Sequence, residues 1–154
     1  MNKSIIFALV ATAMVSGCGE PQATKSAEAL TADKIAETLK KSGLKITDVN
    51  VVTETNDSNH LLGRPNQYTS KVYFYDARHP KGADGSDEGE NTIEVFASPA
   101  DAKARHDYVE SVTKGVPMLL QYQVLRGPAL IRFDKVMLPT EVDGYKQAIS
   151  EIVE

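Results

Sequence analysis

The sequence predicts an α+β domain with an antiparallel sheet of about five strands and helices mainly on one face, in the order α-β-β-β-α-β-β-α. Strand-like segments occur as a group of three and then a pair, and such grouping favours an antiparallel sheet. Apolar residues recur every three or four positions in the intervening segments, which is typical of helices. The chain has 154 residues and one cysteine. We therefore expect a single domain without an internal disulfide.

The first helix is expected to begin after Thr31, which can act as its N-cap. Leu30 and Ile35 occupy the two positions of a hydrophobic staple, and Gly43 can close the C-terminus in the left-handed conformation. Ile35 and Leu39 lie four residues apart and form a narrow apolar stripe. This helix should cover a core.

Three strands are expected next, at residues 45–53, 68–76 and 91–97. The first is rich in β-branched residues. The second alternates, so that Val72 and Phe74 face one side of the sheet while Lys71 and the neighbouring tyrosines face the other. We expect these three strands to be antiparallel neighbours.

The second helix has clear boundary signals, with Ser98 as N-cap, Pro99 at the first helical position and Gly115 at the end. Residues 118–125 and 129–133 then predict a β-hairpin.

The last helix is expected to begin near Pro139 or Thr140. Its apolar residues fall on one face of the helix: Val142, Tyr145, Ile149 and Ile152. Residues 31–154 thus form the predicted domain.

The N-terminus has the order of a signal peptide: a basic Lys3, an apolar segment from Ile5 to Val15, and small residues after it. The apolar segment is much shorter than the roughly 20 residues that a transmembrane helix needs. Residues 1–17 are therefore predicted to be a signal peptide. Residues 18–30 are small and polar, and predict a flexible tether.

The residues Val15-Ser16-Gly17-Cys18 resemble the lipobox of bacterial lipoproteins. The resemblance implies that the Cys18 thiol carries a diacylglycerol group, that cleavage occurs before Cys18, and that this lipid is the protein's one covalent group, with no other cofactor. Gly19 in place of aspartate implies the outer membrane, facing the periplasm, if the cell is Gram-negative. The alternative is that Cys18 is an ordinary residue of the signal peptide.

The segment from Asp57 to Gln67 is long for a hairpin loop, and such loops often carry binding residues. Its candidates for ligand binding are His60, Arg64 and Asn66. The alternative is a structural loop whose leucines plug the sheet edge. The string "LLGRPNQYTSKVYF" resembles segments of uncharacterised small envelope lipoproteins, and it is more faintly similar to a turn of SmpA-type outer-membrane assembly lipoproteins, without the paired helices of that family.

An acidic, glycine-rich segment supplies oxygen ligands of the kind that calcium prefers. Its candidates for metal binding are Asp84, Asp87, Glu88 and Glu90. The spacing differs from that of an EF-hand loop, and the alternative is a solvated hairpin tip.

Catalytic motifs are missing from the sequence, which has no G-x-S-x-G and no histidine pair at helical spacing. We expect a protein that is not an enzyme. Cleavage after Gly17 would remove one lysine and no acid, so the formal net charge would change from −4 to −5 and nucleic acid is not an expected partner. The expected partners are the membrane, through the lipid, and an envelope protein or polymer. A ligand- or cation-binding module is the alternative.

Overall fold

The computed structural model describes residues 29–84, 86–116 and 119–153. The predicted signal peptide, Cys18 and most of the predicted tether lie outside the described residues. The described residues confirm the predicted fold class and the order of its elements. The elements are α1 (Ala32–Lys41), β1 (Ile46–Val51), β2 (Tyr68–Asp76), β3 (Asn91–Phe96), α2 (Pro99–Lys114), β4 (Gln121–Arg126), β5 (Ala129–Asp134) and α3 (Pro139–Ile152).

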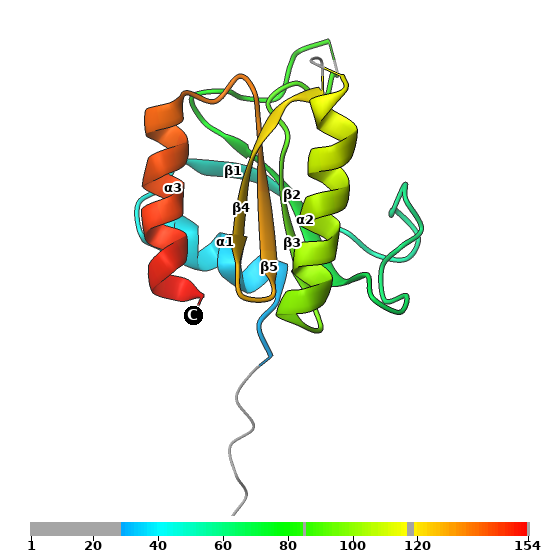
Figure 1. Cartoon of the computed structure of the whole chain (residues 1–154). Coiled ribbons are helices and arrows are strands. Elements are labelled where there is room, and N and C mark those ends of the chain that lie inside the picture. The colour runs from blue at the N-terminus through cyan, green and yellow to red at the C-terminus, as the bar shows by residue number, and fades with distance from the viewer. Residues whose placement is uncertain (1–28, 85, 117–118, 154) are drawn as a thin grey trace, which may run out of the picture.

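The five strands form one sheet in the order β1-β2-β3-β5-β4, and every neighbouring pair is antiparallel (Figure 1). β4 and β5 form the predicted hairpin, and Gly127 in its turn has a φ of +48°, a conformation that glycine adopts at little cost. Among the described residues, no helix combines the length and the apolar character needed to cross a membrane.

The main core lies between the sheet and two helices, α1 and α3. The predicted stripe of α1, Ile35 and Leu39, is fully buried there. Phe133 of β5 packs against Tyr145 of α3, with ring centroids 5.0 Å apart. Val72 and Phe74 face this core, which confirms the alternation predicted for β2.

The opposite face of the sheet carries α2, which packs against β3, β4 and β5. Ala102 of α2 joins Phe96, Leu130 and Tyr68 in a second, smaller apolar cluster. In Figure 1, α3 and α2 stand on either side of the β4–β5 hairpin. The helices therefore lie mainly on one face, as predicted, and α2 is the exception that creates a second layer over part of the other face.

Candidate functional site

A polar pocket of about 380 Å³ opens on the face of the sheet that carries α2. Its walls come from α2, from the strands β2, β3, β4 and β5, and from the loops that precede β2, β3 and β4. Six charged side chains line it: Lys71, Arg105, Arg132, Asp87, Glu90 and Asp134. We call the first three the basic floor and the last three the acidic rim.

Strand register brings the basic floor together. Lys71 of β2 lies opposite Glu94 of β3, and the next row along the same face joins Tyr73, Thr92 and Arg132. Side chains two residues apart on a strand share a face, so Lys71 and Arg132 approach Glu94 from different strands. α2 adds Arg105 above the same carboxylate.

The three cations of the basic floor share one buried carboxylate, that of Glu94. Its Oε1 lies 3.2 Å from Arg132 Nη2, 3.4 Å from Arg105 Nη2 and 3.7 Å from Lys71 Nζ. The Glu94 side chain has no exposed area. Hydrogen bonds between ionised groups are ordinarily about 2.7–2.9 Å long, so each of these contacts is loose. One carboxylate leaves the basic floor with more positive than negative charge.

Two donors of the basic floor make no hydrogen bond to the described residues, although one of them, Lys71 Nζ, lies 3.7 Å from Glu94 Oε1. Lys71 Nζ donates no hydrogen bond there, and its side chain is only 1% exposed. It lies 4.5 Å from the ring centroid of Tyr73 and 5.0 Å from that of Tyr68, which gives cation–π attraction. The buried Nε of Arg132 has no partner there either, although Nη1 donates to Gln121 Oε1 at 3.2 Å. Buried cations with unused donors favour an anionic ligand.

The acidic rim lies at the ends of the same strands. Glu90 directly precedes β3, and Asp134 is the last residue of β5, two positions beyond Arg132 on the same face. Burial raises the pKa of Glu90, and the neighbouring Asp87 raises it further. Among the residues that the structure describes, no ion pair joins any of the three rim carboxylates to a cation.

The structure separates the three residues predicted to bind a ligand in the 57–67 loop. His60 and Arg64 line one hollow of about 210 Å³, whereas Asn66 lines a different hollow beside α2. His60 and Asn66 have φ values of +51° and +62°. Their role in ligand binding stays a prediction.

Asp57 organises this loop from a buried position. Its carboxylate accepts hydrogen bonds from the N–H groups of Leu61 (2.8 Å), Leu62 (2.9 Å) and Asn59 (3.2 Å), and from the Tyr68 hydroxyl (2.7 Å). Burial alone would raise the pKa of Asp57, but the bonds from Tyr68 and the three N–H groups outweigh it and lower the pKa to about 2. Asp57 therefore holds the loop in shape.

The four residues predicted to bind a metal do not gather at one point. Asp87 and Glu90 line the polar pocket, and Glu88 lines a separate hollow beside His79. Asp84 accepts a hydrogen bond from the Ser86 N–H at 3.0 Å. Metal binding by this segment stays a prediction, and the structure gives two of its residues a different place, in the acidic rim.

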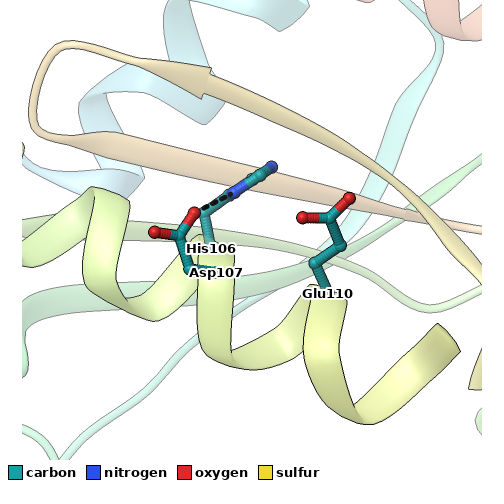
Figure 2. Close-up of side chains that lie close together, drawn as sticks. All are labelled: His106, Asp107 and Glu110. Carbon is teal, nitrogen blue, oxygen red and sulfur yellow. Dashed lines mark hydrogen bonds and ion pairs between the residues drawn. The ribbon is translucent and has the colours of Figure 1, made fainter. Parts of the chain in front are cut away.

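Another group with metal-ligating atoms lies on the outer surface of α2, where His106, Asp107 and Glu110 bring one ligand atom each within 4.8 Å of one another (Figure 2). The two carboxylates already pair with lysines one helical turn away: Asp107 with Lys103 at 2.6 Å and Glu110 with Lys114 at 3.1 Å. These are ordinary ion pairs of an exposed helix surface. The sequence analysis considered only pairs of histidines and missed this group. The four-residue spacing of His106 and Glu110 places both side chains on one face of a helix and could have indicated it.

A partly buried network that the sequence did not indicate joins β2 to α3. Arg78 Nη2 lies 2.6 Å from Asp76 Oδ2, and the Tyr145 hydroxyl donates to the same oxygen at 2.8 Å. Glu141 binds both Arg78 (3.3 Å) and His79 (2.7 Å). Burial raises the pKa of Asp76, but the Arg78 hydrogen bonds outweigh it and the pKa is lowered. The network ties the start of α3 to the end of β2.

No known protein family matches the chain, and neither a curated protein nor a solved structure is significantly similar to it. We therefore infer the function from the geometry of the described residues.

Proposed function

We propose that this protein is a binding protein without catalytic activity, held at the bacterial cell envelope by lipid on Cys18, and that it binds a small charged ligand in the pocket beside α2. The observation that carries the proposal is the basic floor, in which Lys71, Arg105 and Arg132 share the single carboxylate of Glu94. Such an arrangement adds little to the stability of the fold, because buried charges are costly unless each is well paired. A ligand that brings its own negative charge offsets that cost.

The pocket also has the dimensions of a ligand site. Its volume of about 380 Å³ falls within the range of roughly 300–1,000 Å³ that small-molecule sites occupy. Its polar lining indicates a water-soluble ligand held by charge and hydrogen bonds. The rigid sheet positions Lys71 and Arg132, while α2 positions Arg105, so the donors are in place before a ligand arrives.

Binding is tested by thermal unfolding of the full chain in detergent with a panel of small carboxylates, phosphates and amino acids. A ligand present at 100 times its dissociation constant stabilises a protein by about 2.7 kcal/mol. We expect at least one member of the panel to stabilise the wild type and to lose its effect in Arg132→Gln. In that variant Glu94 keeps Arg105 and Lys71 as partners, so the fold should persist.

The matched control is Arg126→Gln, which makes the same substitution at the exposed last residue of β4, outside the lining of the pocket. It should retain the full response to the ligand. Absence of any stabilising ligand across the panel would contradict the proposal.

Contact with another envelope protein is a second candidate function, favoured by apolar side chains exposed near the pocket. Tyr108 and Val112 lie one turn apart on α2 with 60% and 42% of their areas exposed, and Leu119 and Leu120 follow in the connection to β4. Exposed apolar patches often mark interaction sites. Cross-linking in native envelopes should capture a partner with the wild type that Tyr108→Ser no longer captures. Equal recovery of partners with both proteins would exclude this face.

A further inference from the structure

We propose that the ligand of the pocket is a zwitterion, a small molecule with a carboxylate at one end and an ammonium group at the other, separated by a short methylene chain. The inference rests on the proposed function and narrows it to one chemical class. The carboxylate binds the basic floor, and the ammonium group binds the acidic rim.

The charge distribution of the pocket supports this class over simpler ions. A plain anion would bind Arg105 and Arg132 but would be repelled by the carboxylates of the rim. A plain cation would bind Glu90 and Asp87 but would be repelled by the cations of the basic floor. Opposite charges within about 4–6 Å favour each other's ionised forms, and like charges oppose them. A zwitterion is the class that satisfies both ends at once.

Each end of the pocket has charge that the described residues compensate only in part. At the floor, Arg132 Nε has no acceptor among them and Lys71 Nζ donates no hydrogen bond to them. At the rim, burial and the neighbouring Asp87 raise the pKa of Glu90, and the attraction of Lys71, Lys81 and Arg132 opposes this only in part. An ammonium group between these two carboxylates would remove that repulsion and return the pKa of Glu90 toward its ordinary value.

The spacing along β5 gives the approximate separation of floor and rim, because Arg132 belongs to the floor and Asp134 to the rim. Arg132 and Asp134 are two residues apart on one face of the strand, which places their Cα atoms about 6.6 Å from each other. An α-amino acid holds its charges too close together to span this distance, whereas three or more methylene groups between them suffice. Leu119 and Leu120 line the same pocket and offer apolar contact to such methylene groups.

The test is isothermal titration of the full chain in detergent with 4-aminobutyrate, 6-aminohexanoate, glycine, butyrate and butylamine. We expect one of the two longer amino acids to bind at least tenfold more tightly than butyrate, butylamine or glycine. Arg132→Gln should weaken binding of that amino acid and of butyrate alike, because both use the floor. Glu90→Gln should weaken binding of the amino acid by fivefold or more and leave butyrate binding equal or stronger. Arg126→Gln should bind as the wild type does.

The outcomes separate this inference from the function on which it rests. Butyrate binding as tightly as the longer amino acids, with sensitivity to Arg132→Gln, would overturn the zwitterion proposal and leave an anion-binding protein. A preference for the amino acids that survives Glu90→Gln would overturn the role of the rim. No binding by any of these compounds up to 10 mM, together with no stabilising ligand in the wider panel, would overturn both proposals.

Discussion

Replacement of Asp57 by asparagine tests how the long loop before β2 is held. The Asp57 carboxylate accepts four hydrogen bonds, three from backbone N–H groups and one from the Tyr68 hydroxyl. An asparagine amide has one acceptor oxygen, and its NH₂ group would face N–H donors that need an acceptor. We expect Asp57→Asn to destabilise the folded protein while the sheet and helices persist.

The pKa of Asp57 provides a magnitude. A change from 3.8 to about 2 corresponds to roughly 2 kcal/mol of stability at neutral pH, at about 1.36 kcal/mol per pH unit. An unsatisfied buried donor costs about 1–3 kcal/mol, so the variant should lose about 3–5 kcal/mol in total. For a domain of this size, that loss lowers the melting temperature by about 10–25 °C.

The pH dependence gives a signature that a general packing defect lacks. Because the folded-state pKa of Asp57 is depressed, its contribution is fully present above the ordinary value of 3.8 and is lost as the pH falls from there toward 2. Denaturant unfolding of the wild type and of Asp57→Asn should therefore differ most at pH 6–7 and should converge toward pH 2–3. The exposed control Asp143→Asn should change little at any pH. A difference that stays constant from pH 7 to pH 3 would refute the reasoning.

Three further predictions concern single residues. Glu90→Gln should raise the free energy of unfolding at pH 7, because the raised pKa of Glu90 means that its ionised form opposes folding; the gain should disappear below about pH 4, and a lower stability at pH 7 would contradict it. Tyr145→Phe should cost about 1–2 kcal/mol in chemical denaturation, since it removes the hydroxyl that donates to buried Asp76, and an unchanged midpoint would exclude that role. Cys18→Ala should abolish incorporation of a clickable palmitate analogue and leave an uncleaved precursor by intact mass, whereas wild-type protein without acyl mass would rule out the lipid anchor.

The order and type of the elements could be predicted because the local signals agree with the packing. Ser98 accepts a hydrogen bond from the Asp101 N–H, as an N-cap should, and the helix begins at Pro99. The apolar spacing of α1 and the alternation of β2 both match buried positions. Thr31 occupies the expected N-cap position of α1, but its side chain makes no capping hydrogen bond.

The pocket could not be predicted because its residues come from distant parts of the sequence. The alternation of β2 placed Lys71 on the face opposite Val72, but it could not show that Lys71 is buried there beside Glu94, the carboxylate that also binds Arg105 of α2. α2 breaks the simple apolar pattern as well, since Val112 is exposed while Thr113 is buried. A helix that packs over charged groups need not show a regular apolar periodicity, and such local departures are expected at functional sites.

The most direct measurement of the central claim is the NMR signal of the Arg132 Nε–H group in the full chain, assigned by its loss in Arg132→Gln and followed as 4-aminobutyrate is added. Arg132 Nε has no partner among the described residues, so a carboxylate bound on the basic floor should supply one. We expect a saturable downfield shift of this signal and slower exchange of its proton with water, with the Arg126 Nε–H signal unchanged. An Arg132 signal that stays in place while the ligand binds elsewhere on the protein would contradict the assignment of the pocket.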